Sequence, residues 1–253
     1  MVINQAKRRM LEGKPAIGVE VGLGSPLAAE LLSPLGFDFV LVDNQHGFWS
    51  DDSSMNAIRS IALGTATSMA RVRQNDYSAI GRLLDRGVMG IIVPMVNTVE
   101  EAEAAAYAVR YPPKGGRSGG PFGTGFLGSD YMAWANDEIY LGVQIETVQA
   151  ARDAEKIMAV DGIDGCWIGP GDLRLSMDVD TSTPDGREAH RSTILGVFDA
   201  CHKVGKIPGL WTPDAPAALE WIREGALFVT AGADATWVIE GAKKSVRQLG
   251  RSD

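Results

Sequence analysis

The segment FDFVLVDNQHGFWSDDSSMNAIRSIAL, residues 37 to 63, changes its pattern twice. It begins with a nearly continuous apolar run that ends at Asp43, as expected of a parallel strand covered on both faces. It ends in a helical pattern over residues 51–63, which opens with acidic and Ser residues that favour helix starts. We interpret the segment as one β/α unit, whose strand carries Asp43 and His46 to its tip.

The same alternation recurs along the whole chain. Strand-like apolar runs occupy residues 16–21, 38–43, 67–72, 90–96, 140–146, 165–170, 207–212 and 227–232. Helical patterns lie between them, at residues 25–36, 51–63, 76–87, 98–110, 147–159, 187–205, 214–225 and 234–249. Eight β/α units without a shift in composition predict an α/β fold, a single TIM (β/α)8 barrel domain over residues 1–253. An open Rossmann-like sheet is the weaker alternative.

Composition and charge narrow the class of ligand. The acids outnumber the bases 32 to 24 and the formal charge is −8, which disfavours a nucleic-acid partner. No apolar run approaches membrane-spanning length, and the basic N-terminus is not followed by the apolar core of a signal peptide. The two cysteines, Cys166 and Cys201, lie in apolar or helical contexts and are expected to be reduced, buried thiols. We therefore expect a cytoplasmic protein with a small-molecule ligand.

Polar side chains gather at the predicted carboxyl ends of the strands, where TIM barrels carry their chemistry. These residues are Asp43, His46, Arg71, Glu146, Asp172 and Trp211. Each acid by itself has a simpler interpretation as a helix cap. Two carboxylates on neighbouring strands nevertheless favour a site for Mg²⁺ or Mn²⁺, because these ions take one or two protein carboxylates and leave room for water and substrate.

The positions of the histidines and lysines argue against a three-histidine zinc site and against imine chemistry. Of the three histidines, His190 and His202 fall inside one predicted helix, so a three-histidine zinc site is not expected. His46 is then the histidine placed for proton transfer. No lysine lies at the carboxyl end of a predicted strand, which disfavours imine chemistry because that chemistry needs a desolvated amine in the site. The metal and Arg71 are therefore expected to act as the electrophiles that stabilise negative charge on the substrate.

Six blocks of sequence resemble the HpcH/HpaI family of metal-dependent class II pyruvate aldolases. The blocks are FDFVLVDNQHG, MARVRQND, RLLDRGVMGIIVPMVNTVEEA, YPPKGGRSGG, VQIET and VDGIDGCWIGPGDLRLSM, and the likeness runs from about residue 17 to residue 240. Related enzymes are the 2-keto-3-deoxy-sugar-acid and 4-hydroxy-2-oxoheptanedioate aldolases. The resemblance implies a carbon–carbon lyase that joins pyruvate, or a 2-keto acid such as hydroxypyruvate, to an aldehyde through a metal-stabilised enolate.

The resemblance also implies roles for particular residues. It implies Mg²⁺, Mn²⁺ or Co²⁺ held by Glu146 and Asp172, with Gln144 close by. It implies Arg71 on the keto oxygen of the substrate. His46 would act as the acid and base, oriented within a network of Asp43.

Further implications concern the substrate carboxylate and the assembly. The backbone amides of Gly171 and Asp172 would receive the carboxylate, and Gln144 would also bind the substrate. Trp211 is expected to bind the substrate because it lies at the end of a predicted strand. Asp85 would lie near the site, with a reach that extends to a neighbouring subunit. Such enzymes form homo-oligomers, commonly hexamers.

One departure from the family pattern and one loop leave questions open. Many members carry Gly-Glu between the Asp and the His, where this chain has Asn44 and Gln45, so the preferred metal and acceptor are not fixed. The Gly-rich segment 111–128 is expected to be irregular, either a lid that shapes the aldehyde pocket or a solvated connector. It lacks the spacing of a phosphate-binding loop. The alternatives to an aldolase are a metal-dependent lyase acting on an acyl-CoA thioester and a catalytically silent ligand-binding barrel.

Overall fold

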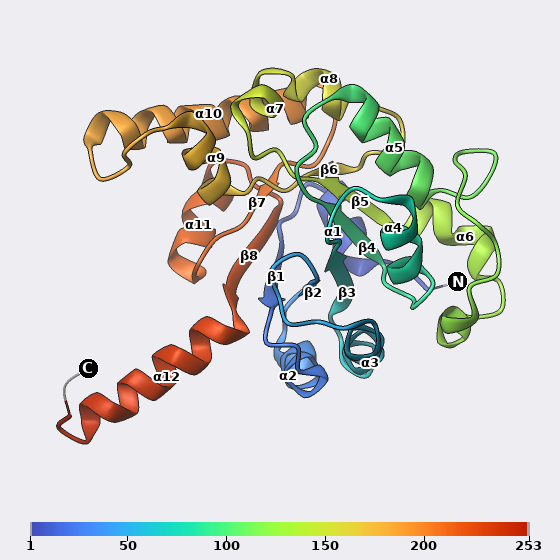
Figure 1. Ribbon diagram of the computed structural model, residues 1–253, viewed down its shortest axis with the longest axis horizontal. Coiled ribbons are helices and arrows are strands. Elements are labelled where there is room, and N and C mark those ends of the chain that lie inside the picture. The colour runs from blue at the N-terminus through green and yellow to red at the C-terminus, as the bar shows by residue number, and fades with distance from the viewer. Residues whose placement is uncertain (1, 252–253) are drawn as a thin grey trace.

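Eight strands form one parallel sheet in the computed structural model, which describes residues 2–251 (Figure 1). They are β1 Ala16–Val21, β2 Phe39–Asp43, β3 Thr67–Arg71, β4 Gly90–Val93, β5 Tyr140–Val143, β6 Gly165–Cys166, β7 Gly209–Leu210 and β8 Phe228–Ala233. The strand order is β6-β5-β4-β3-β2-β1-β8-β7. Parallel bridges from Gly165 to Ile207 and from Ile168 to Leu210 join the two ends of that order, so the predicted TIM-type barrel is confirmed.

Helices follow the strands and cover the outside of the barrel. Their bounds are α1 Gln5–Leu11, α2 Pro26–Leu32, α3 Asp51–Ile61, α4 Tyr77–Leu84, α5 Val99–Val109, α6 Tyr131–Glu138, α7 Val148–Arg152, α8 Ala154–Met158, α9 Pro170–Met177, α10 Pro184–Lys203, α11 Ala215–Arg223 and α12 Asp234–Gln248. Short 3₁₀ helices occupy Ser33–Leu35 and Phe122–Leu127. Figure 1 shows α12 running away from the barrel after β8.

Several elements differ from the sequence prediction. The helices α1, α6 and α9 were not predicted, and the helix predicted at 147–159 is interrupted at Asp153. The segment 111–128 is not wholly irregular, because it contains the 3₁₀ helix Phe122–Leu127. The β4 strand ends at Val93 instead of residue 96, since Pro94 has no amide to donate and Met95 adopts a left-handed φ of 54°.

The inside of the barrel has an apolar lower layer and a polar mouth. Side chains alternate along each strand, so that Val19 and Val21 pack outward under the helices while Gly18 and Glu20 face inward. The lower interior is filled by Ala16, Phe39, Leu41, Met69, Ile92, Tyr140, Trp167, Ile207 and Phe228, with Ala6 and Met10 of α1 packed against them. This layer is a solid floor, and chemistry is confined to the carboxyl ends of the strands.

Two other predictions concern thiols and membranes. Cys166 and Cys201 are buried free thiols, as predicted, with their Sγ atoms 3.5 Å apart. Within residues 2–251, no helix has both the length and the apolar character needed to cross a membrane.

Candidate active site

A buried ion pair joins two neighbouring strands at the mouth of the barrel. Asp43 and Arg71 are register partners at the ends of β2 and β3. The Nε and Nη2 atoms of Arg71 donate to Oδ1 and Oδ2 of Asp43, each at 2.7 Å. The guanidinium also lies 5.3 Å from the ring centroid of Trp167. This two-point contact fixes the plane of Arg71 before any substrate arrives.

The charge of Arg71 is maintained despite its burial. Burial opposes that charge, but the hydrogen bond and the negative charge of Asp43, together with the charges of Glu20 and Glu146, raise the pKa of Arg71 above its ordinary value. Arg71 is therefore a permanent cation in the site, able to stabilise an oxygen that gains negative charge.

A relay of hydrogen bonds continues from Arg71 to the next carboxylate. Arg71 Nη1 donates to Gln144 Oε1 at 3.4 Å, and Gln144 Nε2 donates to Glu146 Oε2 at 2.9 Å. The amide of Met95 donates to Glu146 Oε1 at 2.8 Å, from the left-handed turn that ends β4. Burial and the charge of Asp172 raise the pKa of Glu146. Glu146 and Asp172 are therefore close enough for their negative charges to repel one another.

Asp172 lies in the first turn of α9. Gly169, the residue directly before this helix, lies close to the carboxylate of Glu146. A Cβ atom at Gly169 would lie 2.4 Å from Glu146 Oε2 and 3.2 Å from Gln144 Nε2, so a larger residue there would displace the acid. Asp172 itself is exposed. The amides of Gly171 and Asp172 belong to the first helical turn, whose N–H groups have no partner within the helix.

The donor set fits a hard divalent cation. Glu146 and Asp172 contribute two carboxylates, which is the number that Mg²⁺ or Mn²⁺ takes when water and substrate supply the other ligands. In the part of the chain that is described, no group of three or more His, Cys, Asp or Glu side chains is arranged to hold a metal ion.

The loop after β2 holds His46 at the rim. The amides of Gln45 and His46 lie 3.0 and 3.5 Å from Asp43 Oδ1, so the acid that binds Arg71 also shapes this loop. Asn44 accepts a hydrogen bond from Ser54 Oγ at 2.7 Å and donates to the Val42 carbonyl at 3.2 Å. The side chain of His46 is exposed to solvent, where an incoming substrate can reach it.

Two predicted site residues lie in different surroundings. Asp85 follows α4 and precedes β4, so it lies at the amino end of the barrel, away from the strand-end acids of the same chain. There it pairs with Arg117 Nη2 at 3.0 Å. Trp211 directly follows β7 and packs against the barrel interior, next to Glu20. Of these two residues, the structure brings only Trp211 to the mouth.

The sequence prediction missed Glu20, which faces into the mouth from β1. Burial, followed by the negative charge of Asp43, raises the pKa of Glu20 to about 7, and Arg71 and a hydrogen bond from Trp211 offset part of that effect. The sequence did contain a pattern that could have identified Glu20, because AIGVEV places one acid in an otherwise apolar strand.

Glu20 is expected to make stability depend on pH. Its pKa of about 7 in the folded chain exceeds the ordinary value of 4.5, so its contribution is fully present below pH 4.5 and is lost as pH rises through 7. Glu20→Gln removes this titration. Urea unfolding at pH 5 and pH 8 should therefore show the variant gaining about 2 kcal/mol on the wild type between the two values. An equal difference at both values would contradict the assignment.

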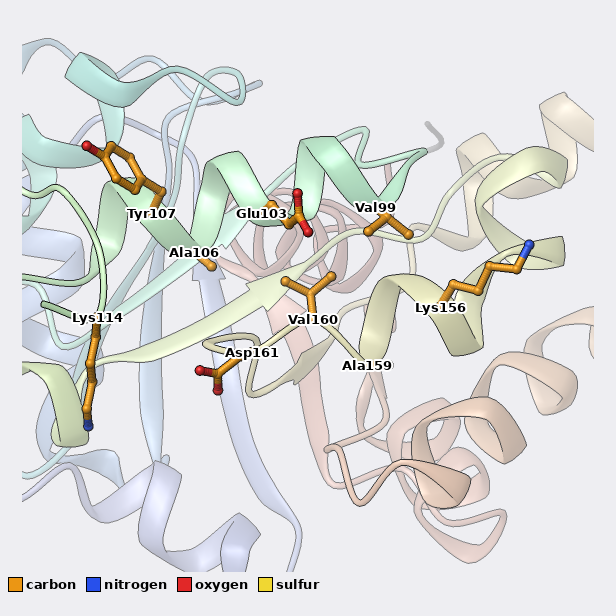
Figure 2. A pocket seen from close by; sticks show the side chains of 9 residues that line it. All are labelled: Val99, Glu103, Ala106, Tyr107, Lys114, Lys156, Ala159, Val160 and Asp161. Atoms are coloured by element: carbon orange, nitrogen blue, oxygen red, sulfur yellow. The ribbon is translucent and has the colours of Figure 1, made fainter.

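A separate hollow of about 510 Å³ lies on the outside of the barrel, between α5 and the end of α8 (Figure 2). Its lining includes Glu103, Lys114, Lys156 and Asp161, which bring charges of both signs. None of the strand-end residues lines it, so we place the chemistry at the mouth of the barrel.

The fold and the site together define a (β/α)8-barrel enzyme with a preformed cation and paired acids at the strand ends. The family model for HpcH/HpaI aldolase/citrate lyase matches residues 17–241, and the chain belongs to this family of carbon–carbon lyases.

The sequences of related proteins align with this chain over nearly its full length. The 4-hydroxy-2-oxo-heptane-1,7-dioate aldolase of Salmonella paratyphi C (strain RKS4594) is 34% identical, over 98% of this chain and 95% of the relative. The protein of the same name from Klebsiella pneumoniae is 35% identical, over 95% and 91% of the two chains. A crystal structure of a HpcH/HpaI aldolase/citrate lyase family protein from Burkholderia cenocepacia J2315 superposes with a TM-score of 0.89 at 26% identity, covering 97% of this chain and 99% of the other.

Proposed function

We propose that this enzyme catalyses reversible aldol addition between a 2-keto acid, such as pyruvate or hydroxypyruvate, and an aldehyde, with a divalent metal as cofactor. The observation that carries the proposal is the continuous relay from Asp43 through Arg71 and Gln144 to Glu146, which faces Asp172. Relatives named as aldolases support the same reaction.

The keto acid binds between α9 and Arg71. Its carboxylate accepts hydrogen bonds from the amides of Gly171 and Asp172, where the positive end of the helix dipole favours an anion. Arg71 holds the keto oxygen through the guanidinium edge that Asp43 leaves free. A cation held by Glu146 and Asp172 supplies Lewis acidity at this end of the substrate.

Arg71 acts when the keto acid gives a proton from C3 to water at the mouth. Negative charge then moves onto the C2 oxygen, and the rigid guanidinium stabilises it without reorganising. Gln144 holds Glu146 in place during this step, because its amide donates to the acid at 2.9 Å. The resulting carbon nucleophile attacks the aldehyde, and the addition returns one proton to the C4 oxygen, which becomes the C4 hydroxyl of the product.

We assign the proton on that C4 hydroxyl to His46. His46→Ala should lower aldol cleavage by about 10² to 10⁴-fold, the usual contribution of a positioned acid or base. Decarboxylation of oxaloacetate should fall far less, because it forms the same enolate of pyruvate without a C4 hydroxyl to deprotonate. Rates of both reactions at saturating Mn²⁺ test the assignment.

His202→Ala is the matched control, since His202 lies on the exposed surface of α10, and both rates should stay at the wild-type level. Equal loss of both reactions in His46→Ala, with unchanged metal content, would mean that His46 serves the enolate step or the shape of the loop.

We further propose a homo-oligomer, for which a hexamer is the form common in such enzymes. Two apolar surfaces support an assembly: Leu27 and Leu31 on α2 are 61% and 63% exposed, and Val238 and Ile239 on α12 are 62% and 53% exposed. Asp85, paired with Arg117 at the amino end of the barrel, would then serve the site of a neighbouring subunit.

A further inference from the structure

Glu20 is an acid at the mouth of the barrel that the proposed reaction leaves without a role. Its register partners are Leu41 in β2 and Ala233 in β8, and its neighbours Val19 and Val21 face the helices. The side chain of Glu20 therefore points across the mouth, toward the centre of the barrel. The side chain of Trp211 lies next to this carboxyl group and lowers its pKa.

The other acids near Glu20 already have partners. Both oxygens of Asp43 accept from Arg71. Asp234, at the start of α12, accepts from the amides of Gly22, Leu23 and Ala235 at 2.9, 3.2 and 2.8 Å. By contrast, Oε2 of Glu20 is inaccessible and has no hydrogen-bond partner among the described residues. Such buried acceptors are uncommon in native proteins unless a ligand or an ordered water satisfies them.

The position of Glu20 indicates which part of the substrate it would meet. Glu20 and Asp43 both act electrostatically on Arg71, the residue that holds the keto oxygen. A substrate held by Arg71 through that oxygen would place its carbon chain in the same mouth, into which Glu20 points. Trp211 lies on the same side of the mouth, where it packs against the barrel interior next to Glu20.

We propose that Glu20 is a specificity-determining residue that binds a hydroxyl group on the carbon chain of the substrate. The proposal rests on the proposed aldolase reaction. A hydroxyl group suits this position because it can donate to a carboxylate and accept from a carboxylic acid, so it pairs with either form of Glu20. An apolar substituent would leave Oε2 without a partner, and an anionic substituent would be repelled by Glu20 and Asp43.

The hydroxyl group belongs either to the keto acid or to the aldehyde. Pairs of substrates with and without the hydroxyl group distinguish these two cases. The keto acid carries it in hydroxypyruvate but not in pyruvate, and the aldehyde carries it in glycolaldehyde but not in acetaldehyde. We would measure kcat/KM for the four combinations in the wild type, Glu20→Leu and Glu20→Gln. The decisive quantity is the ratio of kcat/KM for a hydroxylated substrate to that for its unsubstituted counterpart.

We expect Glu20→Leu to lower this ratio by about 10 to 100-fold for one of the two pairs, the loss typical of a hydrogen bond to a charged group. Glu20→Gln keeps an acceptor oxygen and should lose less. Trp211→Phe removes the polar indole N–H next to Glu20, and it should lower the same ratio in the same pair. Ratios unchanged in both pairs for Glu20→Leu would overturn the proposal.

A binding measurement separates this proposal from the proposed reaction. Intrinsic fluorescence of the six tryptophans, of which Trp211 and Trp167 lie inside the barrel, can follow titration of the Mn²⁺-loaded protein with each of the four compounds. If the wild type turned over no combination, the reaction would be wrong, but a preference for a hydroxylated compound that Glu20→Leu loses would still support the role of Glu20. The same preference in the wild type and in Glu20→Leu would overturn it. Circular dichroism melts check that each variant is folded.

Discussion

Removal of divalent metal should abolish carbon–carbon bond cleavage, and Mg²⁺, Mn²⁺ or Co²⁺ should restore it. Lewis-acid stabilisation is worth several kcal/mol, so we expect the chelated protein to lose activity by about 10³-fold or more. Asp172→Asn should also lose activity when the metal concentration is limiting. In this variant one of the two carboxylate ligands is replaced by a neutral amide, which binds the metal more weakly. Pyruvate release from 4-hydroxy-2-keto acids, measured after EDTA treatment and after readdition of metal, tests the expectation.

Asp172 makes this test sharp because its side chain is exposed in the first turn of α9. Its replacement should leave the melting temperature of the metal-free protein nearly unchanged, while metal titration by calorimetry shows weakened binding. Gly169→Ala is a second way to disturb the same site, since the added Cβ would lie 2.4 Å from Glu146 Oε2. Full activity in protein shown to be free of metal would remove the central claim.

Arg71→Lys should reduce turnover by about 10²-fold or more, although it preserves the positive charge. An ammonium cannot reproduce the planar set of donors that binds both oxygens of Asp43 and the keto oxygen at once. The loss should fall mainly on kcat, because charge on the keto oxygen is greatest in the transition state. Initial rates over a range of keto acid concentrations separate kcat from KM.

The matched control for Arg71→Lys is Arg73→Lys. Arg73 lies two residues further along the chain, is exposed, and donates to the Trp49 carbonyl at 3.0 Å. Its replacement should leave kcat within about twofold of the wild type, as is usual for surface substitutions away from special features. If Arg71→Lys matched this control, Arg71 would be a structural partner of Asp43 and nothing more.

The sequence predicted the barrel because each β/α unit carries its own local signal. Runs such as FVLVD at residues 39–43 are apolar throughout, as buried parallel strands must be, and capped helical patterns follow them. Helices without such a signal were missed. The start of α1 is set by Asn4, whose side chain accepts from the Lys7 amide at 2.9 Å, while its inner face, Ala6 and Met10, packs under the barrel floor.

The end of each strand was predicted less well than its existence. The pattern of apolar residues continues past the last ladder hydrogen bond, because the loops at the mouth still cover the core. Glu146 therefore lies three residues beyond the end of β5, and Asp172 lies in α9 instead of a strand-end turn. The spacing of the predicted site residues from the strand ends therefore required coordinates.

What the sequence by itself determined is the succession of the eight β/α units and the face that carries the polar residues, since parallel strands with helical crossovers bring all their carboxyl ends to one side. The tertiary structure decided which of those residues meet. Barrel closure sets Glu20 near Trp211 and Arg71, residues distant in sequence, and the close approach of Gly169 positions Glu146. It also places Asp85 at the opposite end. A strand that is apolar on both faces does not reveal which alternate side chains point inward, so these pairings depend on packing across the barrel.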